Sequence, residues 1–262
     1  MLLYILEKES IITSIRASFS STRWRHFPAG LPHINLNVSD FLPPSKISSV
    51  NDREIDGAML AMTKAARICL AAHGRGSITK TISLRLCLTS NYLHDIGELV
   101  GKAIGNNKVK TVELVLPTNE ASHCDMTDMV QHANSLICFF DTFPNLLRCL
   151  TRLVLYKARF SKLEMCRLLD NCEQLQQLEL NKCDTGDLST LKINVPNSKI
   201  SHLRLFSCCF EKIEFLCLPK LAILYCETWI TSNAPLSFGY VPCLEELSLV
   251  CSAKRDQLLD SV

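Results

Sequence analysis

One pattern of apolar positions recurs through the second half of the chain. It consists of an apolar residue, two variable residues, a leucine, one further residue and a last apolar residue. Alternation of the last two apolar positions is the period of a β-strand, in which successive side chains point to opposite faces. The five copies therefore predict five short strands, each with one apolar face, at residues 150–155, 175–180, 200–205, 221–226 and 244–249.

The spacing of these copies indicates a repeat. The steps between their middle leucines are 25, 25, 21 and 23 residues, for Leu153, Leu178, Leu203, Leu224 and Leu247. Periods in the twenties are typical of leucine-rich repeats, in which one strand buries little alone and stacked neighbours share a continuous core. Cys183 and Cys208 each follow the last leucine of a copy by three residues, where this repeat has Asn or Cys. The pattern predicts an α/β fold, a leucine-rich-repeat solenoid with a curved parallel sheet and helices on its outer side.

The first half of the chain carries a weaker version of the same pattern. Residues 82–86 and 109–116 predict two more strands, and residues 10–27 and 52–73 have the spacing of amphipathic helices. The step from Val112 to Leu153 is too long for one repeat, so residues 117–145 are expected to form an irregular insertion, helical from Met126 to Phe140. We therefore expect three parts: an amino-terminal segment with a first strand at 1–42, a linker and helix at 43–77, and the solenoid at 78–262.

Two strand registers are open around residues 218–226. In the first, Leu224 and Cys226 point inward, which places Pro219 and Pro242 alike, each two residues before its copy of the pattern. In the second, Leu218, Leu221 and Ile223 form the pattern, and Leu224 turns to the opposite face. The even spacing favours the first register.

Composition narrows the class of protein. The 262 residues are 47% hydrophobic and 21% charged with a net charge of +2, which is typical of a globular chain and gives no basic face for nucleic acid. No window is apolar enough to span a membrane, and charges at residues 7–9 interrupt any signal segment. The 14 cysteines are scattered and lack a Cys-x-x-Cys pair, which favours buried thiols in a reducing compartment, the cytoplasm or nucleus.

Candidate chemical motifs are weak. Residues 74–81 approach a phosphate-binding loop, but Thr79 replaces the glycine needed before Lys80, and a strand follows where a helix is required. His123, Cys124 and His132 have ligand chemistry without the spacing of a standard metal site. No nucleophile elbow is present. We therefore expect no cofactor, no metal and no enzymatic activity.

A resemblance to a known family appears near the amino terminus. Ser21-Thr-Arg23-Trp24-Arg25-His26-Phe27-Pro28 is followed by alternating apolar residues that end in Asp40-Phe-Leu42. This stretch resembles the end of the F-box and the first strand beyond it in the plant F-box/leucine-rich-repeat family. The segment Cys149-Leu-Thr-Arg-Leu153 is also similar to sequences of this family. Taken alone, the basic residues beside Trp24 would also suit a simple helix end, where cations face the last carbonyls.

The resemblance implies a substrate-recognition subunit of an SCF-type cullin-RING ubiquitin ligase. The F-box would dock on a Skp-type adaptor, with Ile15, Phe19, Arg23 and Trp24 as the adaptor-facing residues, and the repeats would hold an unknown protein substrate. The family's opening Leu-Pro-x-Asp helix has no counterpart after Met1, so we expect a shortened F-box. The alternative is a stand-alone leucine-rich-repeat interaction module, or a truncated relative that no longer binds the adaptor.

The strand residues that alternate with the leucines would form the partner-binding face. Tyrosine, arginine and phenylalanine are the side chains that dominate protein interfaces, because they bury area and several of them also hydrogen-bond. The expected partner-binding residues are Arg152, Tyr156, Glu179, His202, Arg204 and Phe206.

Overall fold

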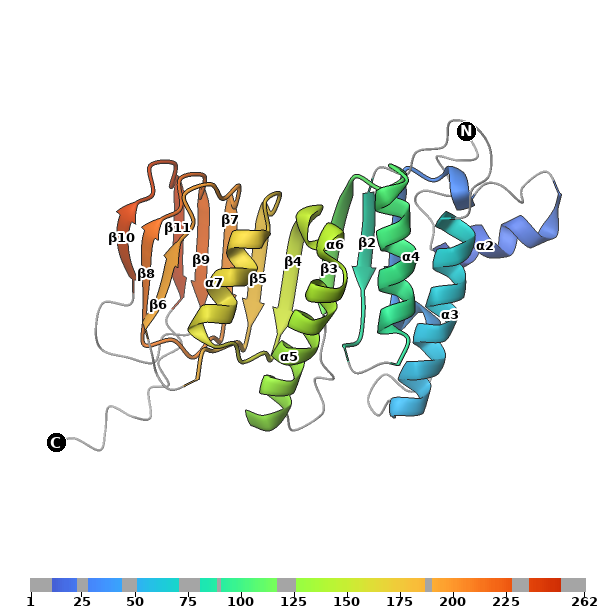
Figure 1. Ribbon diagram of the computed structural model, residues 1–262, viewed down its shortest axis with the longest axis horizontal. Coiled ribbons are helices and arrows are strands. Elements are labelled where there is room, and N and C mark those ends of the chain that lie inside the picture. The colour runs from blue at the N-terminus through green and yellow to red at the C-terminus, as the bar shows by residue number, and fades with distance from the viewer. Residues whose placement is uncertain are drawn as a thin grey trace. The chain divides into compact units, whose positions relative to one another are not determined.

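The computed structural model describes residues 11–22, 28–43, 51–70, 81–88, 91–116, 126–186, 190–227 and 236–250. The chain divides into two compact units, Met1–His123 with Asn134–Leu153, and Cys124–Ala133 with Val154–Val262. Both units combine helices with strands, and every strand pair with a described register is parallel (Figure 1). The expected α/β class with a parallel sheet is therefore confirmed.

The first unit contains three strands that pair in chain order. β1 (His33–Asn37) pairs with β2 (Thr81–Arg85), and β2 pairs with β3 (Thr111–Leu116). The alternating apolar residues of the three strands face the core and are register partners, because the side-chain period of a strand is two: Ile34, Ile82 and Val112 in one row, and Leu36, Leu84 and Leu114 in the next.

The helices of the first unit are α2 (Ile11–Ser20), α3 (Asp52–Leu70), α4 (Leu93–Gly105) and α6 (Pro144–Arg148), with the short 3₁₀ turns η1 (Pro28–Gly30) and η2 (Val38–Phe41). Of these, α2 and α3 lie within the segments predicted from helical spacing, 10–27 and 52–73. Met59, Met62 and Ala66 of α3 are buried at helical spacing. In α4, Gly97 lies so close to the ring of Phe143 that a Cβ atom there would overlap it. The absence of a side chain therefore sets how closely this ring packs on the helix.

Two elements have residues in both units. The helix expected from Met126 to Phe140 is confirmed as α5 (Met126–Thr142), and the first strand of the recurring pattern is β4 (Leu150–Tyr156). The backbone N–H of Val112 donates to the oxygen of Cys149 in the first unit, and that of Lys157 donates to the oxygen of Asn181 in the second (2.8 Å).

Seven further strands and one helix make up the described elements of the second unit. One sheet contains β5 (Gln177–Asn181), β7 (His202–Phe206), β9 (Ile223–Glu227) and β11 (Glu246–Val250) in this order. A three-stranded sheet contains β6 (Thr190–Asn194), β8 (Lys212–Cys217) and β10 (Leu236–Tyr240). From β5 onward the chain alternates between the two sheets, and α7 (Lys162–Asn171) precedes β5.

The register of β5, β7, β9 and β11 pairs equivalent positions of the pattern. Leu178, Leu203, Leu224 and Leu247 form one row of partners, and Leu180, Leu205, Cys226 and Leu249 form the next. Leu224 and Cys226 are buried, whereas Ile223 lies on the other face and is half-buried. This confirms the register with Leu224 inward and excludes the rival one.

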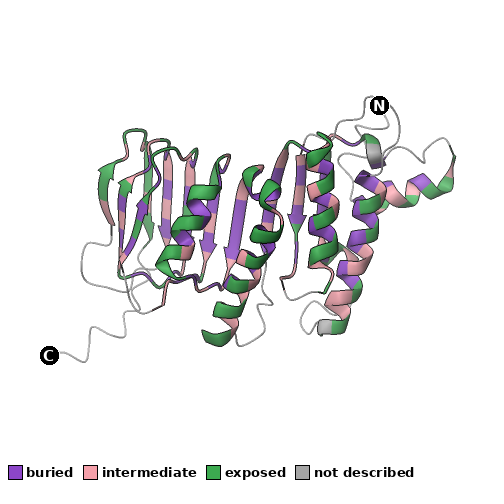
Figure 2. Cartoon of the chain, viewed as in Figure 1, coloured by how far each residue is buried: buried purple, intermediate pink, exposed green. Residues whose placement is uncertain are grey.

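The expectation of helices on the outer side is wrong beyond β5. In the described residues, the elements that follow β5, β7 and β9 are strands β6, β8 and β10. Apolar and polar positions alternate in β6 and over the first four residues of β8, and Leu191, Ile193, Ile213 and Phe215 are buried. Figure 2 shows buried segments within these strands. Such short segments with a period of two bury one face as strands, whereas a helix of the same length would distribute their apolar residues around its axis.

The turn after three of the strands has the same backbone conformation. Lys157, Lys182 and Ser207 have φ of 46°, 52° and 50°, in the left-handed region that non-glycine residues seldom adopt. The N–H of Lys182 donates to the oxygen of Phe206, and that of Ser207 donates to the oxygen of Glu227. These bonds continue the parallel pairing one residue past each strand.

A buried cysteine follows two of these turns. The thiol of Cys183 donates to the oxygen of Leu155 (3.8 Å), and that of Cys208 donates to the oxygen of Leu180 (3.3 Å). Burial raises the pKa of Cys183 to about 12 and raises that of Cys208 well above its usual value. Each thiol thus bonds a backbone carbonyl of the strand in the preceding copy of the pattern, β4 for Cys183 and β5 for Cys208. This is a structural role.

The core is less covered at the last strand of each sheet. Leu247 and Leu249 of β11 are 45% and 52% exposed, although their row partners in β5 and β7 are buried. Phe238 of β10 stacks on Phe215 and is still 42% exposed.

Candidate protein-interaction surface

The face of β5, β7, β9 and β11 opposite their leucine rows is called here the outward face. None of its residues is buried. The strand register arranges them in three rows: Gln177, His202, Ile223 and Glu246; Glu179, Arg204, Tyr225 and Ser248; and Asn181, Phe206, Glu227 and Val250.

An aromatic pair lies in the middle of the outward face. The rings of Phe206 and Tyr225 have centroids 5.0 Å apart at an interplanar angle of 40°, and both side chains are half-buried. The hydroxyl of Tyr225 donates to Oε2 of Glu227 (3.1 Å). Desolvation raises the pKa of Tyr225, and the hydrogen bond and charge of Glu227 act in the same direction. The pair offers an apolar platform with a fixed polar edge.

Other polar groups of the outward face are also held by neighbours. Nδ2 of Asn181 donates to Oε1 of Glu179 (3.0 Å). Nδ1 of His202 is 2.8 Å from the hydroxyl of Ser201. Arg204 is exposed and has no hydrogen bond or ion pair with any described residue.

The structure brings most of the predicted partner-binding residues together. Glu179, His202, Arg204 and Phe206 lie on the adjacent strands β5 and β7. Tyr156 ends β4 in the same unit, next to the Lys157 N–H that bonds Asn181. Arg152 belongs to the first unit and is half-buried.

Two features of this face were not predicted from the alternation. Val154 occupies an alternating position of β4 but is 2% exposed, so it is not available for contact. The pairing of Phe206 with Tyr225 depends on the lateral register of β7 and β9. The sequence signal for it was present, because both residues occupy outward positions of neighbouring copies of the pattern.

The predicted adaptor-facing residues are described in part. Ile15 and Phe19 lie on α2, where Ile15 is half-buried and Phe19 is 76% exposed. The buried residues of α2 are Ile11, Ser14 and Ser18, so Phe19 is on its accessible side. Arg23 and Trp24 lie outside the described residues.

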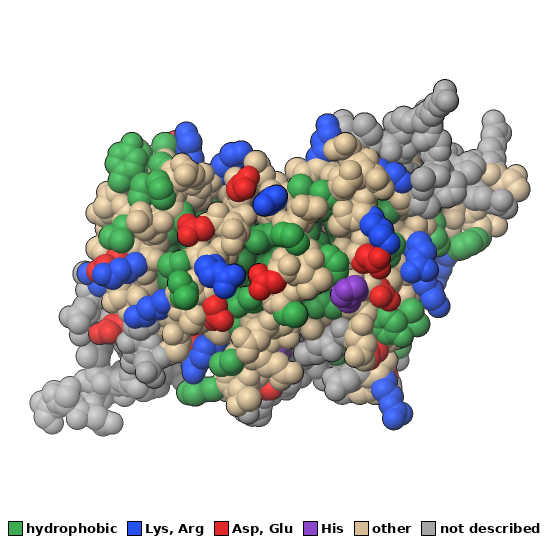
Figure 3. All heavy atoms as spheres, in the orientation of Figure 1, with side chains coloured by type: hydrophobic (Ala, Val, Ile, Leu, Met, Phe, Trp, Pro, Cys, Tyr) green, Lys and Arg blue, Asp and Glu red, His purple; other side chains and the backbone are tan. Residues whose placement is uncertain are grey.

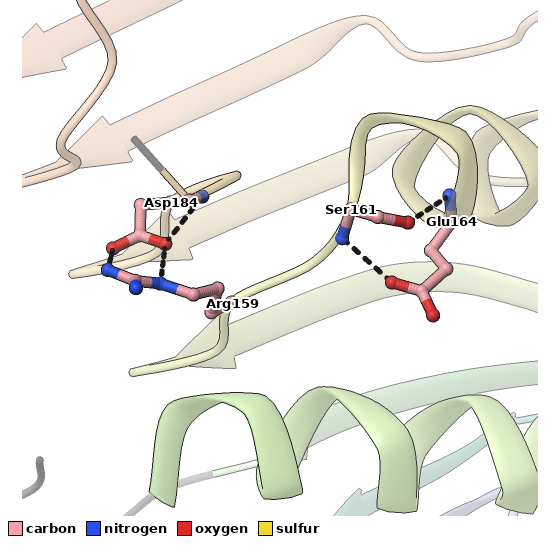
Figure 4. Close-up of polar contacts among 5 residues, drawn as sticks. Arg159, Ser161, Glu164 and Asp184 are labelled. Atoms are coloured by element: carbon pink, nitrogen blue, oxygen red, sulfur yellow. Dashed lines mark hydrogen bonds and ion pairs between the residues drawn. The ribbon is translucent and has the colours of Figure 1, made fainter. Parts of the chain in front are cut away.

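A buried ion pair in the second unit connects two turns. Nε and Nη2 of Arg159 donate to Oδ1 and Oδ2 of Asp184 (2.6 and 2.8 Å), and the N–H of Gly186 also donates to Oδ1 (3.1 Å) (Figure 4). Asp184 is 4% exposed. Since its carboxylate is fully engaged, the pair joins the turn after β4 to the turn after β5 and has no free acid or base for catalysis.

A small cavity lies in the described part of the first unit. It has a volume of about 170 Å³ and is lined by Arg67, Leu70, Leu99, Lys102, Ala103, Asn106 and Lys108. Lys108 donates to the oxygen of Leu70 (3.2 Å), and Lys102 pairs with Glu98 (2.6 Å). These cations lie at the carboxyl-terminal ends of α3 and α4, where they compensate the helix dipoles.

Charged side chains elsewhere are interspersed. On the side shown in Figure 3, lysines and arginines alternate with acidic residues and form no single-sign patch. On the three-stranded sheet, Glu214 pairs with Lys192 (3.3 Å) and Lys212 (2.9 Å). Among the described residues, no group of three or more His, Cys, Asp or Glu side chains could hold a metal ion, and no helix is long and apolar enough to cross a membrane.

The chain is thus an α/β protein with parallel sheets and an exposed strand face rich in aromatic and polar side chains. Comparison with family models, with curated proteins and with solved structures gave no match. Its function is accordingly argued from the residues themselves.

Proposed function

We propose that the chain is a leucine-rich-repeat solenoid that binds proteins, and that it serves as a substrate-recognition subunit of an SCF-type cullin-RING ubiquitin ligase. The observation that supports binding is the outward face, where the half-buried Phe206–Tyr225 pair adjoins the exposed Arg204. Side chains of these types, adjacent on a rigid sheet, are typical of interface hot spots. The subunit itself carries no chemistry in this proposal.

The repeat assignment is supported by register and spacing together. Leucines 21 to 25 residues apart in the sequence are direct partners in the sheet, and a solenoid of stacked repeats requires this relation. In this proposal residues 1–42 are an F-box remnant with the first strand, residues 43–77 are a linker and helix, and residues 78–262 are the solenoid. It would act in the cytoplasm or nucleus.

Co-purification of the full chain with a Skp-type adaptor and its cullin tests the ligase role. We expect the adaptor to be retained, and we expect Phe19→Ala to weaken retention without changing the melting temperature, because Phe19 is 76% exposed and its truncation removes little packing. Leu163→Ala is the matched control, since Leu163 of α7 is 71% exposed.

A folded full chain that does not retain the adaptor would refute the ligase role. Protein binding through the outward face would then favour the alternative of a stand-alone interaction module, or of a relative that has lost adaptor binding. An equal loss for Phe19→Ala and Leu163→Ala would show that Phe19 is not an adaptor contact.

A further inference from the structure

Arg204 is the one arginine or lysine in the three rows of the outward face, and it forms no hydrogen bond or ion pair with a described residue. Its guanidinium is exposed on β7, and its register neighbours are Glu179 on β5 and Tyr225 on β9. A guanidinium has five N–H donors in a planar fork, which fits a carboxylate through two parallel hydrogen bonds. Among the described residues, none accepts a hydrogen bond from these donors.

The nearby carboxylates of the protein are bound to neutral donors. Oε1 of Glu179 accepts from Asn181 (3.0 Å), and Oε2 of Glu227 accepts from the Tyr225 hydroxyl (3.1 Å). The structure therefore leaves the Arg204 guanidinium of the centre row without a carboxylate bonded to it, although Glu179 lies on the neighbouring strand. This arrangement complements a negative group on a partner.

An apolar platform lies beside this cation. Phe206 follows Arg204 by two residues on the same face of β7, and its ring packs on Tyr225 with centroids 5.0 Å apart. Residues two apart in a strand are separated by ~7 Å. In an extended peptide, side chains two positions apart have this same separation and point the same way, so one carboxylate and one aromatic side chain could reach both features together.

We propose that the outward face binds an extended protein segment that carries Glu or Asp two residues from an aromatic side chain. The carboxylate pairs with the Arg204 guanidinium, and the aromatic side chain packs on the Phe206–Tyr225 pair. This inference rests on the proposed protein-binding role and names the chemistry of the partner at that surface.

Nuclear magnetic resonance of the full chain with isotope-labelled arginine side chains gives a direct test. The Nε–H signal of Arg204 is assigned by its loss in Arg204→Gln and is followed during titration with the peptide acetyl-Gly-Glu-Gly-Trp-Gly-amide. Peptides with Gln or Lys in place of Glu, and one with Glu and Trp adjacent, are the matched comparisons. We expect the first peptide to shift the Arg204 signal and the others to bind about tenfold or more weakly, as for loss of a charge-assisted hydrogen bond.

Variants separate charge from packing. Arg204→Gln should lose the preference for the Glu peptide, Arg204→Glu should reverse it in favour of the Lys peptide, and Phe206→Ala should weaken all Trp peptides alike. Arg148→Gln is the control, because Arg148 is an exposed arginine of α6 in the first unit. Melting temperatures confirm that each variant is folded.

Equal affinity for the Glu, Gln and Lys peptides, a preference of the unaltered protein for Lys, or no shift at millimolar peptide would each overturn the inference. Adaptor co-purification is read separately. Peptide binding without adaptor retention would refute the ligase role alone, and adaptor retention without peptide binding would refute this inference alone.

Discussion

At the scale of single residues, burial separates leucines that occupy equivalent positions. Leu178 and Leu247 belong to the same row of register partners, yet Leu178 is 2% exposed and Leu247 is 45% exposed. The first is enclosed by neighbouring strands on both sides, whereas β11 is the last strand described in its sheet. The same side chain therefore contributes differently to stability at the two sites.

Truncation of these two leucines should give unequal losses of stability. Leu178→Ala should lower the free energy of unfolding by about 2–5 kcal/mol, because it removes buried contacts and leaves a cavity. Leu247→Ala should cost about 1 kcal/mol or less, because nearly half of its surface remains in water. Urea titration followed by circular dichroism measures both. A loss near zero for Leu178→Ala would mean that it does not lie in the core.

Cysteine reactivity should follow burial. Since the thiolate is the reactive form, the raised pKa of Cys183 and Cys208 lowers the fraction that can react at a given pH. At mildly alkaline pH we expect N-ethylmaleimide to modify the exposed Cys138, Cys166 and Cys243 first, and to reach Cys183 and Cys208 only after unfolding. Mass spectrometry of the labelled peptides gives the order. Early labelling of Cys208 in the folded protein would contradict its burial beneath the turn.

At the scale of elements, local signals decide where helices and strands begin. Ser161 precedes α7, and its hydroxyl accepts from the N–H of Glu164 (3.2 Å) while the Glu164 carboxylate accepts from the N–H of Ser161 (2.7 Å) (Figure 4). This capping box is readable from Ser161-Lys-Leu-Glu164, because the two bonds depend only on residues three apart.

Removal of the cap should destabilise α7 by a predictable amount. Ser161→Ala loses the acceptor for the Glu164 N–H and should lower the free energy of unfolding by about 1 kcal/mol. Ser161→Asn keeps a side-chain acceptor and should change it by a few tenths at most. Thermal or urea unfolding compares the two. Equal effects would show that the cap hydrogen bond does not stabilise the helix.

The elements that were misjudged are those for which two structures compete locally. Residues 190–195 alternate apolar and polar positions, but a solenoid template places a helix in this part of the unit. β6 forms because β8 lies beside it and completes its backbone hydrogen bonds in parallel. Such pairing partners lie about twenty residues away, so the choice between helix and strand was not contained in the segment alone.

At the scale of the whole molecule, the two units share one mode of construction. Each has parallel strands whose apolar rows are in register. In the second unit the outward face is open along four strands, which is why the proposed binding function is assigned there. The resemblance to F-box proteins rests mainly on residues 21–28, of which only Ser21, Thr22 and Pro28 are among the described residues.

The sequence by itself determined the α/β class and the positions of the strands in the recurring pattern, because both follow from periodicity along the chain, and it favoured the inward register of Leu224 that the strand pairing then confirmed. Only the tertiary structure decided which outward side chains form a hydrogen bond with a neighbouring side chain and which do not. Glu179 bonds Asn181, Glu227 bonds Tyr225, and Arg204 forms no hydrogen bond or ion pair within the described part of the chain. These choices depend on lateral neighbours that come from separate copies of the pattern, and a linear pattern does not specify how such side chains pair.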